Sequence, residues 1–431
     1  MPFLQRLAWM RHSLLRVTVA FGLAVAMWAY VDLILVANQQ VDAVQRGVPR
    51  GNLSDLYPRW VGARDLLLAG RDPYSQQVTR EAQKGYYGRV LDSRNPHDPA
   101  DQQAFAYPVY VVFLLAPTIR ADFDDVQIAF RWILLGLTIL SVPLWLKVLQ
   151  WRVSRASVLT IVLLTLGSFP AAQGIKLQQL SLLVGAFIAA GLAAVVSGWL
   201  VLAGIVFAVA TIKPQITLPL LTWLAVWISG DLRRRWRLAL SFSISMAVLL
   251  IASEIVLPGW KREFWVAVQA YRQYTHGISV LAQLLGESAG VVATALLLTV
   301  LMWICWRGRK VEPVAPEFGL IGALVLAVTI IVIPTWAPYN QVLLVPAILL
   351  LVRDWRGVMR AGSAARLIYL LTVFLVAWPW VAATWLDISL LFRPAAAVQA
   401  QWALPLYTSL PIPVGVAATL LSHSWYMQRK A

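Results

Sequence analysis

The chain has 431 residues, of which 60% are hydrophobic and only 13% are charged, and its formal net charge is +16. This composition excludes an ordinary soluble domain, whose charged share is about twice as high. Cys305 is the only cysteine, so an intrachain disulfide and a cysteine-based metal cluster are excluded. Apolar runs near the length of a bilayer crossing recur along the chain. They predict a polytopic, all-α integral membrane protein with one membrane-embedded domain over residues 1–431.

The basic residues gather in the gaps between the apolar segments, where acids are few. This is the positive-inside pattern, which orients membrane helices and suits an anionic leaflet. The charge therefore indicates a membrane partner and not a nucleic acid, and it predicts a cell-membrane protein with both termini in the cytoplasm. The 19 cations are Arg6, Arg11, Arg16, Lys147, Arg152, Arg155, Arg233, Arg234, Arg235, Arg237, Arg307, Arg309, Lys310, Arg353, Arg356, Arg360, Arg366, Arg429 and Lys430.

This orientation predicts about 12 transmembrane helices. The segment 107–119 is apolar but has only 13 residues and is bounded by Pro108 and Pro117. A full crossing there would move Arg152 and Arg155 outside, so we expect this segment to dip into the membrane and return. The predicted crossings are 17–37, 126–149, 156–172, 180–197, 199–212, 216–229, 238–257, 289–306, 317–333, 339–352, 364–386 and 403–422.

A long polar loop, 38–105, follows the first crossing and carries 9 basic and 8 acidic residues. It is predicted to be extracytoplasmic and to form part of an active site. Ser54 can cap a helix that Gly70 ends, and Asp55 would stand at its start, either as a functional acid or only as a helix cap. We expect this helix to lie at the interface, and a second helix to run from Ser75 towards Gly85. The apolar face of the first helix comprises Leu56, Trp60, Ala63, Leu67 and Leu68.

Polar residues of several apolar segments fall on the same side as Asp55. They occupy the turns 173–179, 213–215 and 334–341 and the loop 258–288. Polar groups at the rim of the hydrocarbon are costly and usually face a cavity. Their placement predicts one outward-facing cavity.

The first loop contains an acid, an aromatic residue and a helix with small residues, followed by Gly-x-Asp-Pro-Tyr. This pattern resembles the opening of glycosyltransferase family 87. The later pairs Lys213–Pro214 and Tyr339–Asn340, and the turn from Gly174 to Gln178, are also similar to motifs of that family. The family belongs to the GT-C superfamily of membrane enzymes and includes polyprenol-phosphate-mannose-dependent α-mannosyltransferases. The residues that carry the opening resemblance are Asp55, Gly70, Asp72, Pro73, Tyr74, Tyr107 and Pro108.

The resemblance implies transfer of mannose, or another hexose or pentose, from a polyprenyl-phosphate donor to a lipid or glycan hydroxyl on the extracytoplasmic face. Asp55 is the expected general base, because an acceptor hydroxyl must lose its proton as it attacks. Cations are expected at the departing phosphate, where negative charge develops. In order of preference these are Lys213, Arg59, Arg64, Lys176 and Arg262.

The remaining expected contacts to substrate are aromatic or polar residues on the same side. Some family members carry histidines in the late turn, where this chain has Ala337, Pro338 and Tyr339. His276 is the candidate to replace them, or it is an incidental loop residue. An interfacial aromatic belt and a snorkelling Lys213 are the alternatives for these features. The expected substrate-binding residues are Tyr57, Asp72, Tyr74, Tyr107, Gln178, Gln215, Trp336, Tyr339, Asn340 and His276.

No spacing of metal ligands and no phosphate-cradling glycine loop is present in the sequence. We therefore expect a lipid-linked donor, no cofactor and no divalent metal, and no obligate protein partner is evident. Two other classes stay open. A flippase or transporter of a lipid-linked sugar would favour mid-membrane polar groups and internal repeats. An envelope glycan polymerase or ligase would depend on an outer-loop arginine or histidine and not on Asp55.

Overall fold

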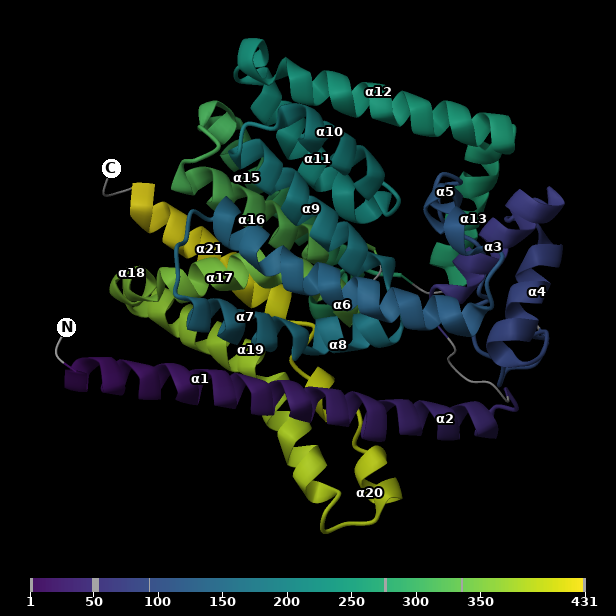
Figure 1. Ribbon diagram of the computed structural model, residues 1–431, viewed down its shortest axis with the longest axis horizontal. Coiled ribbons are helices and arrows are strands. Elements are labelled where there is room, and N and C mark those ends of the chain that lie inside the picture. Colours follow the sequence, from purple (N-terminus) through teal and green to yellow (C-terminus); the bar gives the residue numbers. More distant parts are fainter. Residues whose placement is uncertain (1–2, 49–53, 93, 275–276, 335, 429–431) are drawn as a thin grey trace.

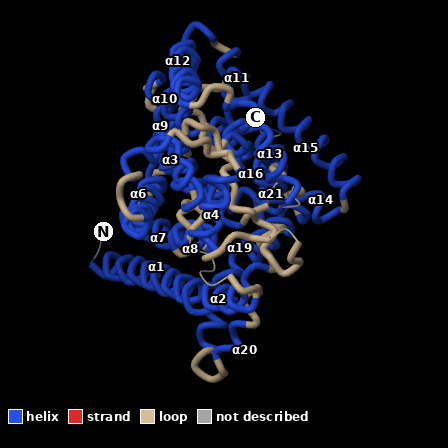
Figure 2. Tube along the Cα trace, turned by 90° about the vertical axis from the view of Figure 1, so that its right-hand side faces the viewer, coloured by secondary structure: helices blue, strands red, loops and turns tan. Residues whose placement is uncertain are grey.

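The computed structural model describes residues 3–48, 54–92, 94–274, 277–334 and 336–428. The described residues form helices and loops and no strands (Figure 2). The prediction of an all-α protein is confirmed for them.

Within the described ranges, five helical segments are long and apolar enough to cross a membrane. The first, Ser13–Gln45, joins α1 (Phe3–Tyr30), a π-helical turn η1 (Val31–Leu35) and α2 (Val36–Gln45). The others are α6 (Phe123–Val148), α12 (Leu232–Val256), Glu287–Lys310 with α15 (Glu287–Arg307) and η3 (Gly308–Lys310), and α19 (Ser363–Ser389). A sixth span arises if α7 (Arg155–Leu166) and α8 (Phe169–Lys176), which are bent by 59°, count as one.

Six shorter apolar helices coincide with the other predicted crossings. They have 10–17 residues. A helix of 11 residues such as α10 is only about 16 Å long, well below the thickness of a hydrocarbon core. The count of 12 crossings therefore stays a prediction. The six segments are α9 (Leu180–Val196), α10 (Leu200–Ala210), α11 (Pro214–Ser229), α16 (Pro316–Val332), η4 with α17 (Pro338–Arg353), and Ile412–Ser422 of α21 (Ile412–Gln428).

Basic and polar features lie at opposite ends of the molecule. In Figure 1, α1 begins and α21 ends on the left, where α12 also starts with its arginines. The loop helices α3 (Tyr57–Ala69) and α4 (Gln76–Tyr87) lie on the right, beside α13 (Trp260–Tyr274). The orientation of these two ends in a membrane stays a prediction.

The first loop helix is more buried than expected. Its end is as predicted, because Gly70 adopts the left-handed conformation with φ +63°. Its burial extends over most faces, whereas Leu67 is half-buried and Leu68 is 48% exposed. The expected single apolar face is therefore wrong for Leu68. Other parts of the loop cover this helix, so it is buried on more than one face.

The second loop helix begins as predicted. The side chain of Ser75 accepts a hydrogen bond from the backbone N–H of Val78, and the helix continues to Tyr87.

The loop shares one hydrophobic core with the membrane helices. Leu56 and Trp60 of the loop belong to the same buried cluster as Leu180, Ile216 and Leu343. The segment 107–119 forms only α5 (Val111–Leu115) and η2 (Ala116–Thr118), and the backbone carbonyl of Thr118 accepts a hydrogen bond from Trp60 Nε1 at 3.2 Å. It is too short to cross, as expected. This packing fixes the loop against the bundle and places its polar end at the α8–α9 turn.

The remaining helices connect these elements. They are α14 (Val280–Leu285), η4 (Pro338–Leu344), α17 (Val345–Arg353), α18 (Trp355–Arg360), α20 (Ala395–Gln399) and η5 (Leu404–Leu406).

Candidate active site

The start of α3 is hydrogen-bonded to the turn between α8 and α9. The backbone N–H of Asp55 donates to the carbonyl of Leu177 at 3.0 Å, and the hydroxyl of Ser54 donates to the same carbonyl at 3.3 Å. The Ser54 oxygen also accepts from the N–H of Leu56 at 3.1 Å, which holds the chain as it enters the helix. Asp55 is thereby presented, half-buried, to the membrane helices.

Gln179 connects the Asp55 carboxylate to the ammonium group of Lys213. Its Nε2 donates to Oδ2 of Asp55, and its Oε1 accepts from Nζ of Lys213 at 3.3 Å. Gln179 is only 3% exposed and Lys213 only 5% exposed. An acid from the loop and a cation from the α10–α11 turn therefore meet within one side-chain network.

The ammonium group of Lys213 has further partners on the bundle side. It donates to the hydroxyl of Ser181, which in turn donates to Oδ1 of Asn340 at 2.6 Å. Nζ also lies 5.2 Å from the centre of the Tyr339 ring. Lys213 is thus buried within a polar network and does not snorkel away from the bundle.

A second cation lies on the loop side of Asp55. The guanidinium of Arg59 donates through Nη1 to the backbone carbonyl of Asp55 at 2.8 Å and stacks 4.8 Å from the Tyr107 ring. Its Nε is buried and has no hydrogen-bond partner among the described residues. A buried donor without a partner carries a free-energy cost.

Burial controls the protonation of the acids. It raises the pKa of the Asp55 carboxyl; Arg59 lowers this pKa, Asp101 raises it, and Lys213 and Gln179 lower it, with a net increase. Burial likewise raises the pKa of Asp101, whose Oδ1 accepts from the Gln103 N–H at 2.9 Å. A carboxylate with a raised pKa is a stronger base at neutral pH.

The central part of the chain matches a known family. Residues 105–334, more than half of the chain, match the model of glycosyltransferase family 87. The chain belongs to glycosyltransferase family 87. The predicted resemblance is therefore confirmed at the level of the family, and the protein is a membrane glycosyltransferase. No curated protein and no solved structure matches the chain.

The matched range of this family 87 glycosyltransferase holds only part of the network. Tyr107, Gln179, Ser181 and Lys213 fall within it, and Asp55 precedes it. The role of Asp55 therefore depends on the structural contacts and not on the family match.

Four residues that we expected at the phosphate or substrate of this glycosyltransferase have other surroundings. Lys176 pairs with Asp32 of η1. Arg64 is exposed and lies 5.2 Å from the Trp60 ring. Arg262 and Gln215 are exposed at the starts of α13 and α11. The network around Asp55 includes none of the four.

Gln178 and Asp72 hold turns instead of facing the network. Gln178 is fully buried, donates from Nε2 to the carbonyl of Ile175 at 2.8 Å and accepts from Gln127 at 3.0 Å. Oδ1 of Asp72 accepts from the N–H of Tyr74 at 2.9 Å. Both side chains are occupied by local backbone or by a neighbouring helix.

The remaining predicted aromatic residues are partly buried. Tyr57 is half-buried and lies edge-on to Phe123, with ring centres 4.7 Å apart. The Tyr74 hydroxyl donates to the backbone carbonyl of Tyr107 at 2.6 Å. Trp336 is half-buried, and its Nε1 has no hydrogen-bond partner among the described residues. His276 lies outside the described residues.

Sequence reasoning missed Gln179 and Ser181 as site residues. Gln179 belongs to the predicted polar turn 173–179 and is the N-cap residue of α9, and Ser181 is the second residue of that helix. The signal in the sequence was the pair of adjacent glutamines, Gln178 and Gln179. We selected Gln178 as the substrate-binding residue. Tyr271 of α13 was also missed, although the negative charges of Asp101 and Asp55 are close enough to raise its pKa further after burial.

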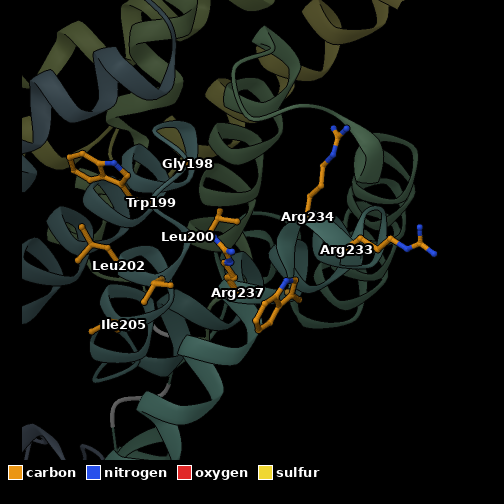
Figure 3. A pocket seen from close by; sticks show the side chains of 10 residues that line it. Gly198, Trp199, Leu200, Leu202, Ile205, Arg233, Arg234 and Arg237 are labelled. Atoms are coloured by element: carbon orange, nitrogen blue, oxygen red, sulfur yellow. The ribbon is translucent and has the colours of Figure 1, made fainter.

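A basic pocket lies apart from the network. Among the described residues, no three histidine, cysteine or acidic side chains lie together as metal ligands. A pocket of about 750 Å³ lies between the starts of α10 and α12 (Figure 3). It is lined by Trp199, Arg233, Arg234 and Arg237, residues of the basic end of the molecule.

Proposed function

We propose that this glycosyltransferase moves mannose, or another hexose or pentose, from a polyprenyl-phosphate donor to a hydroxyl of a lipid or glycan acceptor. The observation that carries the proposal is that Asp55 and Lys213 contact the two ends of one amide group, that of Gln179. Sugar transfer needs a base at the acceptor and a cation at the departing phosphate. This pair supplies both within a single site.

The chemical step uses each group once. The acceptor oxygen attacks the anomeric carbon, and its proton passes to the carboxylate of Asp55. The bond between that carbon and the phosphate oxygen breaks, and its electron pair stays on the phosphate. Lys213 and the unpartnered Nε of Arg59 stabilise the charge that develops there. A single displacement of this kind inverts the anomeric configuration.

An apolar groove supports a donor with a lipid chain. The groove has a volume of about 640 Å³, runs between α7, α17 and α19, and is lined mostly by hydrophobic residues. One of its eight polar or charged lining residues is Gln341, which follows Asn340 of the network in the chain. A prenyl chain is apolar and matches this lining.

The position of the network supports an extracytoplasmic reaction. The arginine-rich start of α12 lies at the opposite end of the molecule from the loop helices (Figure 1). Basic ends of membrane helices face the cytoplasm. The polar network would then open outward, in a cell-membrane protein whose termini are cytoplasmic.

The test is sugar release by purified protein in lipid nanodiscs. Undecaprenyl-phosphate mannose is the donor probe and octyl mannoside the acceptor probe. Wild type, Asp55→Asn and the control Asp42→Asn are compared, because Asp42 is a half-exposed acid of α2 whose side chain pairs with Arg46. We expect Asp55→Asn to reduce kcat by about 10²–10⁴-fold with donor binding retained, and Asp42→Asn to match wild type.

The other outcomes separate the alternatives. Turnover that survives Asp55→Asn would move the base elsewhere and would favour an envelope polymerase or ligase. In sealed proteoliposomes, movement of the donor across the bilayer without sugar transfer would indicate a flippase. Absence of turnover with pentose and hexose donors would overturn the proposed donor class.

A further inference from the structure

Gln179 uses both polar atoms of its side chain on groups of opposite charge. Only one orientation of the amide satisfies both, because the NH₂ group donates and the carbonyl oxygen accepts. In that orientation Nε2 faces the Asp55 carboxylate and Oε1 faces the Lys213 ammonium. The amide is a neutral spacer between the two charged groups.

The backbone around Gln179 is held firmly. Its N–H donates to the carbonyl of Gly174 at 2.8 Å, and its own carbonyl accepts from the N–H of Leu182 at 3.1 Å. The preceding residue, Gln178, has a left-handed φ of +50° and ends the turn. A Cβ at position 174 would come within 2.2 Å of a methyl carbon of Leu182, so this turn packs closely. The position of the amide is therefore fixed before any substrate binds.

We propose that Gln179 is a positioning residue that holds the proton-accepting carboxylate of Asp55 and the phosphate-binding ammonium of Lys213 one amide apart. This proposal uses the roles that the proposed function gives to those two residues. A direct ion pair would occupy the lone pairs that the acceptor proton needs and the hydrogens that the phosphate needs. The spacer keeps both groups ionised and leaves them free to act on different ends of the reacting bond.

Loss of the amide changes the protonation of Asp55 in a known direction. The hydrogen bond from Gln179 favours the charged carboxylate and lowers its pKa, so removal of the amide raises it. The other titratable groups near Asp55 are still present in such a variant. They are Arg59 of α3, Asp101 of the loop, Lys213, and the tyrosines Tyr86, Tyr87, Tyr271 and Tyr339.

The first measurement is a pH titration of Asp55 in the resting protein by difference infrared spectroscopy. The protonated-carboxyl band that is absent from Asp55→Asn identifies the residue. In Gln179→Met we expect its midpoint to rise by about one pH unit, a tenfold change in proton affinity. In Gln179→Glu the midpoint should rise further, because a second carboxylate replaces the donor. The control Gln77→Met alters an exposed residue of α4 and should leave the midpoint unchanged.

The second measurement is kinetic and concerns Lys213. Gln179→Met should raise the KM for undecaprenyl-phosphate mannose by about tenfold and move the acid limb of the pH–rate profile to higher pH. A residue with only a structural role would lower activity without moving that limb or the infrared midpoint.

The two measurements separate this inference from the proposed function. An unchanged midpoint in both variants would overturn the role of Gln179, whatever the enzyme transfers. A shifted midpoint in a protein that turns over no polyprenyl-phosphate sugar would support the contact to Asp55 and overturn the donor class. If Gln179→Met does not fold, the infrared midpoint of Asp55 in Gln179→Glu tests the role of Gln179 in its place.

Discussion

The hydroxyl of Ser181 donates a hydrogen bond of 2.6 Å to the side-chain oxygen of Asn340. The two residues are separated by 159 positions in the chain and connect the start of α9 to η4. Because the same hydroxyl accepts from Lys213, this contact orients the cation that we assign to the departing phosphate.

Replacement of Ser181 therefore tests whether its hydroxyl positions the ammonium group of Lys213. In Ser181→Ala, Lys213 loses one acceptor and Asn340 loses its donor. A hydrogen bond to a charged group contributes about 1.5–3 kcal/mol. We expect KM for the polyprenyl-phosphate donor to rise at least about tenfold, with a smaller effect on kcat. Ser197→Ala, at the far end of α9, is the matched control, and an unchanged KM in Ser181→Ala would contradict the assignment.

The pH dependence of activity follows from the raised pKa of Asp55. The active form of a base is deprotonated, so activity is present above the pKa and falls as the pH drops through it. Burial raises this pKa, and Arg59 opposes the increase. The acid limb of wild type should lie above the usual range of an aspartate, and Arg59→Met should move it higher still. A pH–rate profile of kcat checks this, and a limb that moves lower in Arg59→Met would be inconsistent with Asp55 as the base.

The apolar groove can be tested by filling it. Val345 of α17 lines the groove and is half-buried, so Val345→Trp places a large ring in the path proposed for the prenyl chain. We expect KM to rise several-fold for a long-chain donor and to change little for a donor with a short prenyl chain. Leu218→Trp, at a position that is 63% exposed on α11, serves as the control. Equal effects on both donors would remove the groove from the donor site.

The stability of the contact between α1 and α7 depends on Gly167. A Cβ at this position would lie 2.4 Å from Cα of Ala24, a backbone atom that cannot turn aside. Gly167→Ala should lower the free energy of unfolding by about 1–3 kcal/mol. Gly136→Ala on α6 is the matched control, because nothing lies within 4 Å of the added methyl group and helix propensity favours alanine. Thermal unfolding in detergent compares the two, and an equal melting temperature would contradict the predicted clash.

The positions of the helices were predictable from the apolar runs. The start of α4 at Ser75 and the end of α3 at Gly70 followed from local capping rules. Their burial was not predictable, since Leu68 was expected to share a buried face with Trp60 and is 48% exposed. Burial of a helix depends on every neighbour that covers it, and these neighbours come from distant parts of the chain.

The sequence by itself determined the all-helical class, the family resemblance and the separation of basic gaps from polar turns. These properties depend on composition, periodicity and short motifs, which act locally. Only the tertiary structure decided that Gln179, and not Gln178, meets Asp55. The left-handed turn at Gln178 directs that side chain towards Gln127 and the next one into the network. Hydrogen-bond partners depend on backbone angles and on the approach of distant segments, and neither is encoded in the spacing of residue types.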